Sequence, residues 1–564
     1  MPGLFGHIKK HHQSTSAISR IIHMQEELYP VTVEHEYQDQ RLAAVRCFSF
    51  YEKMTHQDES GWLQIWVEGC AYNLAEIAHH YQQQFQDLNQ ALIWGYQYQM
   101  LAEILATLDG IFCAVLYDRQ QKKISLISDR NGMRSLFYYH KNGFFAWASE
   151  TKAFLALDFF EKKLDTQALS CFMDLGYLVG DISYFEGVSL LPPATLLTYD
   201  MDADRLHSLH YWSWSHIKQC NISFDDAVDS LGEIVTRAVG RRLDMTESLV
   251  FPISGGLDSR MLLAATYRLY PEYKGPCFTF GTHACADIVL AQQVTDMAGW
   301  AHEIHELTPD NWFERRIPTI WVTDGQLDMQ HMHGCEFVDD IAKQGRFVMN
   351  GYSGDAILGP SFLRADTTNK RINKNIAEEY YGRYAYLADI ESSFYDIPHV
   401  EPNLFINRVR RFTNMGTLAS SPWLEHKKPF LDNELIEFVF SINDEYRLGN
   451  KLYSTMLLNQ YPEFYKTIPW QKTGKTIDNN PEIAMPLCTT ENYTDYANWI
   501  RKPDIAVKID RILNSPAALY RNFIDEDWHK IYLVPHLKQN LNRSNKILRA
   551  VTIELFLQNC FQYP

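Results

Sequence analysis

Paired cysteines and long apolar runs are both missing from this sequence. None of its ten cysteines belongs to a CxxC pair, so neither a zinc ribbon nor a disulfide framework is indicated. No stretch approaches the roughly eighteen uninterrupted apolar residues of a membrane span. The start, residues 1–13, lacks the apolar core of a secretory signal. We therefore expect a cytoplasmic protein with reduced cysteines in its interior and no membrane partner.

Positive charge is also in short supply. The 52 Lys and Arg residues are outnumbered by 69 Asp and Glu residues, which gives a formal net charge of −17. Such a balance repels a phosphate backbone, so nucleic acid is not an expected partner. Any small polyanionic ligand would need local compensation from backbone N–H groups, a lysine or a divalent cation.

The chain is long enough for two domains. Its 564 residues are 46% hydrophobic and 21% charged, which is ordinary for a folded protein. Short apolar runs rich in β-branched and aromatic residues predict strands at 61–69, 110–118, 123–129 and 143–149. Residues 75–108 predict one or two helices. We expect a layered α+β domain with a large antiparallel component over residues 1–208.

The second half, residues 222–564, alternates strands with helices. Ser223 is a candidate cap for a helix over 223–243. A strand–turn–helix pattern follows at 247–269, a strand and a helix at 275–299, and a strand that ends in a glycine turn at 345–355. This alternation predicts a doubly wound parallel sheet of the α/β class, and the pattern is mostly helical from about residue 370.

The clearest chemical signal is Ser254-Gly255-Gly256-Leu257-Asp258-Ser259, where a hydrophobic strand turns into a helix. Ser254, Gly255, Gly256, Asp258 and Ser259 are the candidate phosphate-binding residues, because glycines allow close approach and a helix start has unpaired N–H groups. A helix start contributes roughly 0.3–1 kcal/mol to the binding of an anion, and up to about 2 kcal/mol when the site is partly buried. That is too little for a triphosphate, so a divalent ion and a lysine are expected. No Lys follows the glycines, so the segment is not a Walker loop.

A second motif, Asn350-Gly351-Tyr352-Ser353-Gly354-Asp355, ends a later strand. Ligands of open α/β sheets bind outside the carboxyl ends of the strands, so we expect Asp258 and Asp355 to face one crevice and Gly351 to line it. Two hard carboxylates suit Mg²⁺, which keeps waters and phosphates as its other ligands. Taken alone, Asp355 is more typical of a turn aspartate without a ligand.

Together these motifs resemble those of the asparagine synthetase family. Residues 254–259 resemble its pyrophosphate loop, and residues 350–355 its second aspartate motif. KPFLDNELIEFVFSI (428–442) resembles its VPFLD helix, and IPWQKTGK (468–475) its late lysine motif. The resemblance implies ATP and Mg²⁺ as cofactors and an ATP pyrophosphatase-type synthetase domain in the second half.

The first half resembles the glutaminase domain of that family at 108–118 and 128–155, but it departs from it at four places. Members that hydrolyse glutamine begin Met-Cys-Gly, whereas this sequence reads Met1-Pro2-Gly3, and proline has no thiolate. The HRGPD segment of the family's glutaminase domain has no recognisable counterpart in this sequence. Residues 68–73 replace NGEIYN, and residues 95–99 replace GSDTE without its acid. We expect a glutaminase-like scaffold that does not hydrolyse glutamine.

β-Lactam synthetases and carbapenam synthetases share this loss and use the substrate's own amine, and lasso-peptide cyclases resemble the synthetase half. The β-lactam-forming relatives have a Tyr three residues before the second aspartate, paired with a later Glu, as the base that deprotonates the amine. Tyr352 occupies that position, and Glu378 or Glu379 is the candidate partner. A packing role for Tyr352 is the alternative.

Lys472 falls where the family has a lysine that contacts the phosphates and the reacting carbonyl. A fixed cation there would stabilise charge in the transition state. Lys475 is the second candidate, and a solvated loop lysine is the alternative.

The run His331-Met332-His333-Gly334-Cys335 has a spacing that suits a metal. No fourth ligand is evident, so we expect histidines that line the substrate cleft instead of a zinc site.

These inferences predict a ligase that adenylates a carboxylate, releases pyrophosphate and AMP, and forms a lactam or macrolactam natural product. The expected substrate is a small molecule or peptide that carries a carboxylate and an amine. A precursor peptide or its carrier and a homo-oligomer are the candidate partners. The alternatives are an ammonia-dependent asparagine-type synthetase and a nucleotide-binding pseudoenzyme.

Overall fold

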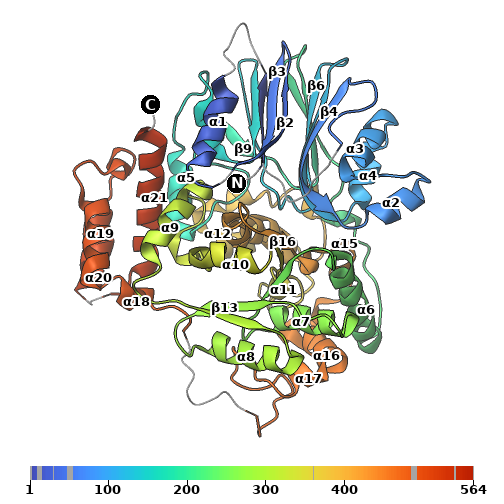
Figure 1. Ribbon diagram of the computed structural model, residues 1–564, viewed down its shortest axis with the longest axis vertical. Helices are drawn as coiled ribbons and strands as arrows, with labels where there is room; N and C mark the ends of the chain where they lie inside the picture. Colours follow the sequence, from blue (N-terminus) through green and yellow to red (C-terminus); the bar gives the residue numbers. More distant parts are fainter. Residues whose placement is uncertain are drawn as a thin grey trace.

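A computed structural model describes residues 3–8, 16–29, 31–47, 55–359, 361–483, 492–538 and 541–562. Antiparallel strands form the upper half of the molecule in Figure 1, and a sheet with flanking helices forms the lower half. Pro2, on which one prediction rests, lies outside the described residues. The predicted ranges 1–208 and 222–564 stay predictions of where the two halves separate.

The N-terminal half contains two antiparallel sheets, as predicted. The first consists of β1 (Gly3–Ile8), β2 (Val33–Gln38), β3 (Leu42–Cys47), β7 (Phe137–Lys141), β8 (Phe144–Ala148) and β9 (Val188–Leu190). The second consists of β4 (Leu63–Ala71), β5 (Gly110–Asp118), β6 (Lys123–Ser128), β10 (Thr195–Asp200) and β11 (Arg205–His210). Their orders are β2-β3-β1-β8-β7-β9 and β11-β10-β6-β5-β4. Apolar side chains of both sheets are buried in the core, which accounts for the apolar runs in the sequence.

Five helices accompany these sheets: α1 (Ser16–Glu26), α2 (Leu74–His80), α3 (Leu88–Gln97), α4 (Leu101–Thr107) and α5 (Thr166–Leu175). Three of them lie where one or two were predicted, over 75–108. The chain is interrupted because Gln82 and Gln99 take left-handed φ values of 52° and 59°. Asp87 then caps α3 by accepting a hydrogen bond from the N–H of Gln90 at 2.9 Å.

The second half is built on a parallel sheet. Its strands are β12 (Leu249–Pro252), β13 (Cys277–Gly281), β14 (His302–Glu306), β15 (Phe347–Met349) and β16 (Glu425–Lys427). Their order is β14-β13-β12-β15-β16, and every neighbouring pair is parallel. The order reverses between β12 and β15, so the switch point of this doubly wound sheet lies between the two strands that precede the sequence motifs.

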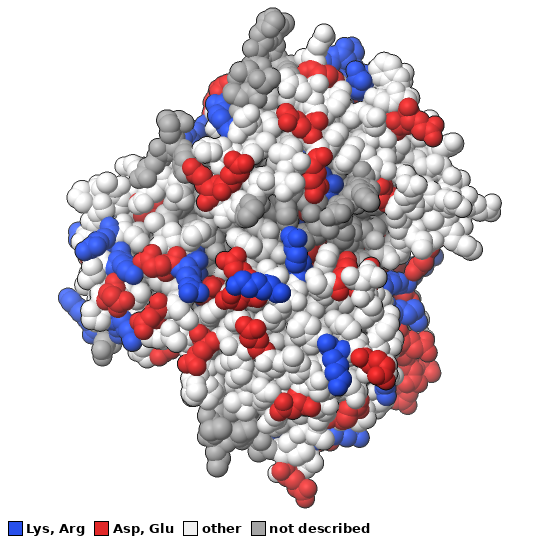
Figure 2. Space-filling view, in the orientation of Figure 1, with Lys and Arg blue, Asp and Glu red and all other residues white. Residues whose placement is uncertain are grey.

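Helices flank this sheet: α6 (Phe224–Arg242), α7 (Leu257–Leu269), α8 (Ala286–Ala298), α9 (Phe313–Val322) and α10 (Val338–Gln344). Ser223 caps α6 as predicted, since its hydroxyl accepts a hydrogen bond from the N–H of Asp226 at 3.2 Å. Figure 2 shows acidic side chains gathered over α6. The exposed acids of this helix are Asp225, Asp226, Asp229 and Glu233. They make this face a poor surface for a phosphate backbone.

The remainder is mostly helical, as predicted. Its helices are α11 (Gly354–Ile357), α12 (Lys374–Tyr381), α13 (Glu401–Leu404), α14 (Asn414–Ala419), α15 (Asn433–Val439), α16 (Lys451–Gln460), α17 (Pro462–Tyr465), α18 (Tyr496–Trp499), α19 (Pro503–Asn514), α20 (Val534–Leu537) and α21 (Ser544–Gln562). Helix α21 packs against α5 and α9, so the C-terminal segment contacts both halves (Figure 1). None of the described helices combines the length and apolar composition that crossing a lipid bilayer would require.

Candidate active site

The two sequence motifs meet at the switch point of the parallel sheet. A Cβ atom on Gly354 would lie 2.4 Å from Cγ of Asp258, and one on Gly351 would lie 3.0 Å from the backbone nitrogen of Ser259. These glycines therefore let the loop after β15 contact the start of α7. Ser353 takes a left-handed φ of 68°, which turns the chain between them. The structure thus brings Asp258 and Asp355 together, and burial and the charge of Asp355 raise the pKa of Asp258 to about 7.

The glycine turn is held by side chains around it. The hydroxyl of Ser259 accepts from the N–H of Ser254 at 3.1 Å and lies 3.0 Å from the Ser254 hydroxyl. The N–H of Gly256 donates to Oγ of Ser254 at 3.2 Å. Because these N–H groups already have acceptors, the remaining backbone donors for an anion are those of the first turn of α7, and the two hydroxyls add to them.

Two residues of this site were not predicted. Asp287, at the start of α8, accepts the N–H of Gly255 at 2.9 Å, and burial raises its pKa. Its place just after β13 was the signal that could have found it. Tyr453, on α16, donates a hydrogen bond to Oδ1 of Asp258 at 3.0 Å. It lies 195 residues from Asp258 in the sequence, and no local pattern connects the two.

A cavity of about 450 Å³ opens at these loops, and we call it the nucleotide cavity. Its lining includes most of the predicted phosphate-binding and metal-binding residues: Ser254, Gly256, Asp258, Ser259, Gly351 and Asp355. Gly255 is buried behind the turn, where its Cβ would meet the side chain of Gln471. Oxygen donors from two carboxylates and two hydroxyls, beside a helix start, fit a magnesium-bound polyphosphate.

The late lysine motif contacts the turn, but its lysines face solvent. The N–H of Gln471 donates to the carbonyl of Gly255 at 3.1 Å. Lys472 and Lys475 are exposed, and Nζ of Lys472 lies 5.5 Å from the centre of the Trp470 ring. Neither lysine is among the described residues that line the nucleotide cavity. The phosphate contact of Lys472 therefore stays a prediction.

The structure does not bring Tyr352 together with Glu378 or Glu379. The Tyr352 hydroxyl donates to the carbonyl of Val409 at 2.8 Å, and the ring is buried. Both glutamates lie exposed on α12, where Glu379 pairs with Arg364 at 2.7 Å and Glu378 lies 3.8 Å from Lys374. To act as a base, Tyr352 would have to give up its backbone hydrogen bond.

His331 and His333 line a second cavity of about 430 Å³, which adjoins the nucleotide cavity. Nδ1 of His331 is bonded to Asp328 at 2.6 Å. Within the part of the chain that the structure describes, the metal-type cluster is elsewhere and consists of His399, Glu401 and Asp444.

That cluster is filled by a cation of the chain itself. The Arg447 guanidinium contacts Glu401 at 2.7 Å and also pairs with Asp444. His399 is bonded to Asp444 at 2.6 Å. The group is therefore a buried ion-pair network and not a metal site.

Fold and site together define an amidotransferase-like half joined to a synthetase half. Residues 1–212 match the family model of the glutamine amidotransferase domain, and residues 230–411 match that of asparagine synthase. Two of the similar proteins are named asparagine synthetases. Asparagine synthetase [glutamine-hydrolyzing] 3 of Bacillus subtilis is 25% identical over 60% of this chain and 62% of its own. Putative asparagine synthetase [glutamine-hydrolyzing] 1 of Methanocaldococcus jannaschii is 24% identical over 72% of this chain and 69% of its own. The chain belongs to the asparagine synthetase family.

The similarity has limits. The match spans less than two thirds of the Bacillus subtilis relative, at 62% of its length. Among solved structures, a glutamine phosphoribosylpyrophosphate amidotransferase of B. subtilis gives a TM-score of 0.26 at 12% identity, over 54% of this chain and 65% of its own.

Proposed function

We propose that this chain is an ATP-dependent, AMP-forming carbon–nitrogen ligase that adenylates a substrate carboxylate and joins it to an amine. The observation that carries the proposal is the pair of carboxylates, Asp258 and Asp355, held together beside a helix start at the switch point of the sheet. Two adjacent carboxylates repel each other unless a proton or a cation compensates. Magnesium-bound ATP supplies that cation and the phosphates that suit the helix start.

In this proposal each residue has a defined task. Asp258 and Asp355 hold Mg²⁺, which neutralises charge on the departing pyrophosphate. Ser254, Ser259 and the first N–H groups of α7 bind the phosphates. The substrate carboxylate attacks the α-phosphorus, and the bond to pyrophosphate breaks. The amine then attacks the acyl carbon, AMP leaves, and the amine proton passes to a base, for which Tyr352 and a water are the candidates. Lys472 is the candidate cation for the acyl oxygen.

We further propose that the amidotransferase-like half does not hydrolyse glutamine. The sequence has proline at position 2, and residues aligned with the glutamine-binding segments are used by the fold. The Asn73 side chain donates to the carbonyl of Thr107 at 2.9 Å and accepts the N–H of Asp109 at 2.8 Å. The Tyr96 hydroxyl donates to Asp118 at 3.0 Å. The amine would then come from the substrate, as in formation of a lactam or macrolactam natural product.

The test is ATP–pyrophosphate exchange with a panel of carboxylic acids, followed by amide formation with amines. We expect AMP and pyrophosphate as products, and Asp258→Asn should lower the exchange rate at least about 100-fold, or roughly 2.7 kcal/mol. Release of ADP and phosphate would contradict the adenylation step. Nucleotide binding without turnover of any acid would favour a pseudoenzyme.

Two additions to the panel separate the finer proposals. Glutamine should give no glutamate above background, whereas steady glutamate release would contradict the loss of glutaminase activity. Aspartate with ammonium is included because the relatives are named asparagine synthetases. Efficient asparagine formation from that pair would assign the ammonia-dependent alternative in place of a lactam-forming enzyme.

A further inference from the structure

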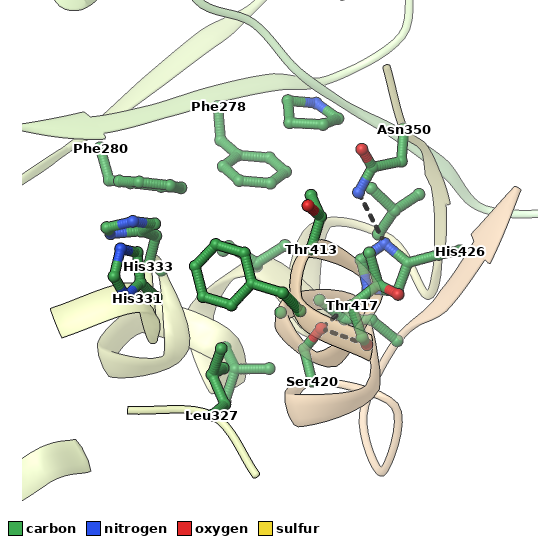
Figure 3. Close-up of a pocket in the computed structure, with 18 residues that line it drawn as sticks. Phe278, Phe280, Leu327, His331, His333, Asn350, Thr413, Thr417, Ser420 and His426 are labelled. Carbon is green, nitrogen blue, oxygen red and sulfur yellow. Dashed lines mark hydrogen bonds between the residues drawn. The ribbon is translucent and has the colours of Figure 1, made fainter. Parts of the chain in front are cut away.

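Figure 3 shows the second cavity, which we call the apolar cavity and which shares part of its lining with the nucleotide cavity. Its volume of about 430 Å³ equals roughly 14 waters at ~30 Å³ each. Six residues line both cavities: Pro252, Phe278, Phe280, His333, Asn350 and Thr413. We call them the shared rim. The two cavities are therefore adjacent along these residues.

The walls of this cavity are mainly hydrophobic. Besides the shared rim, its apolar lining is Leu327, Val338, Ile341, Val348, Phe412 and Leu424. No Lys, Arg, Asp or Glu is among the described lining residues. A charged substrate group placed inside would be desolvated without an ion partner, which is strongly unfavourable.

Asn350, His426 and Ser420, on one side of the cavity, form a chain of hydrogen bonds. Oδ1 of Asn350 accepts the N–H of Tyr352 at 2.9 Å, so its Nδ2 is the donor to Nδ1 of His426 at 3.0 Å. Nε2 of His426 then carries the proton and donates to Ser420 at 2.7 Å. Burial, aided by the charge of Lys428, lowers the pKa of His426 well below its usual range. This side of the cavity offers no charge to a ligand.

His333 differs from these residues because only one of its two ring nitrogens is hydrogen-bonded to a described residue. Nε2 lies 3.2 Å from the Tyr493 hydroxyl, while Nδ1 is buried and has no hydrogen-bond partner among the described residues. Burial lowers the pKa of His333 as well. Figure 3 shows His333 beside Phe280 on the side of the cavity opposite Asn350 and His426. Because Nδ1 is buried, His333 presents a neutral ring and no charge to the cavity.

We propose that the apolar cavity holds the uncharged body of the substrate, with the reacting carboxylate at the shared rim. The substrate class is a carboxylic acid with an aromatic or aliphatic chain, and not an acid with a second charge. This inference rests on the proposed ligase function, whose site it deepens.

Gly416 offers a way to close the cavity without disturbing the fold. It lies on α14 in the cavity lining, and a Cβ atom there would meet nothing within 4 Å. A leucine at this position would extend into the cavity, and it favours a helix more than glycine does. Gly240, on α6, is the matched control, because its Cβ would meet only Leu269 at 4.0 Å and it lines neither cavity.

The experiment is calorimetric binding of 6-phenylhexanoate and of L-aspartate, with Mg²⁺ and α,β-methylene-ATP present, which cannot lose pyrophosphate. We expect 6-phenylhexanoate to bind at least about tenfold more tightly than aspartate. Gly416→Leu should weaken 6-phenylhexanoate binding at least about tenfold, whereas Gly240→Leu should leave it within about twofold. Equal or tighter binding of aspartate, or equal binding by the Gly416→Leu variant, would overturn the inference.

Binding and turnover separate this inference from the proposed function. If 6-phenylhexanoate binds as expected but no acid supports exchange, the cavity assignment stands and the ligase proposal fails. If aspartate supports exchange and 6-phenylhexanoate neither binds nor reacts, the ligase proposal stands and the cavity assignment is wrong.

Discussion

At the scale of single residues, the site depends on the missing side chain of Gly354. A Cβ there would lie 2.4 Å from Cγ of Asp258, so Gly354→Ala must displace the carboxylate or the loop. We expect at least about a tenfold loss of exchange activity and a destabilisation of about 1–3 kcal/mol. Gly416→Ala is the matched control, since the same methyl group meets nothing within 4 Å. That variant should be equally or more stable, by up to about 1 kcal/mol. Urea unfolding and exchange assays on both variants measure the difference, and full activity of Gly354→Ala would contradict this geometry.

A second consequence at this scale is pH dependence. Burial and the charge of Asp355 raise the pKa of Asp258 from 3.8 to about 7. Binding of Mg²⁺–nucleotide must release this proton, so we expect affinity to rise up to about tenfold per pH unit below 7 and to level off above it. Without ligand, the free energy of unfolding depends on pH with the opposite sign. The contribution of Asp258 to the free energy of unfolding falls as pH rises from about 4 to 7, because the unfolded carboxyl ionises first. Calorimetry from pH 5.5 to 8.5 measures the affinity. An unchanged pH profile in Asp258→Asn would contradict the assignment of Asp258 as the titrating group.

The sequence predicted the residues of the two loops, because glycines and acids at strand ends follow local rules. It did not predict that Ser254 and Gly255 have their N–H groups occupied by Ser259 and Asp287. It also proposed a Glu partner for Tyr352 that the structure places elsewhere. Such pairings depend on how distant segments pack, and spacing along the chain carries no information about them.

At the scale of elements, α16 supports the start of α7 through the hydroxyl of Tyr453. The Tyr453 hydroxyl donates to Asp258 at 3.0 Å, which lowers the pKa of that carboxyl against the effects of burial. Tyr453→Phe should therefore move the midpoint of the pH dependence upward by about one unit. Tyr465→Phe is the matched control on α17, because its hydroxyl donates at 2.8 Å to the carbonyl of Leu257 and not to the carboxylate. It should cost about 1 kcal/mol of stability and leave the midpoint in place. An equal midpoint shift in both variants would contradict this role for Tyr453.

Elements with strong apolar patterns were predicted, and those without them were not. The sequence indicated β12, β13 and β15, whose residues are largely buried. It missed β14, whose HEIHE sequence is polar and mostly exposed, and β16, which has three residues. Both are edge strands of the sheet. Edge position allows polar side chains and short length, so hydrophobic pattern alone cannot reveal such strands.

At the scale of the whole molecule, the two halves are joined by buried charges. Arg242, on α6, is fully buried and contacts Asp109 of the first half at 2.9 Å and Asp432 of the second at 2.8 Å. Burial raises the pKa of Asp109 to about 6. For Asp432 burial acts in the same direction, but the Arg242 charge and hydrogen bond prevail and lower its pKa. One guanidinium thus compensates a carboxylate from each half, and its contact with Asp109 forms only when both halves are present.

Arg242→Met should therefore destabilise the whole chain by about 3–5 kcal/mol, because buried Asp109 loses its cation and Asp432 keeps only Arg241. The loss should shrink at low pH, where the abandoned carboxyls bind protons, and adding Asp109→Asn should recover part of it. Lys163→Met is the control: Lys163 pairs with Glu186 at 2.7 Å, but the two side chains are 68% and 47% exposed. Loss of this exposed ion pair should lower the free energy of unfolding by less than about 1 kcal/mol. Urea unfolding at pH 5 and pH 8 measures both variants. If Arg242→Met and Lys163→Met cost the same, the buried triad does not hold the halves together.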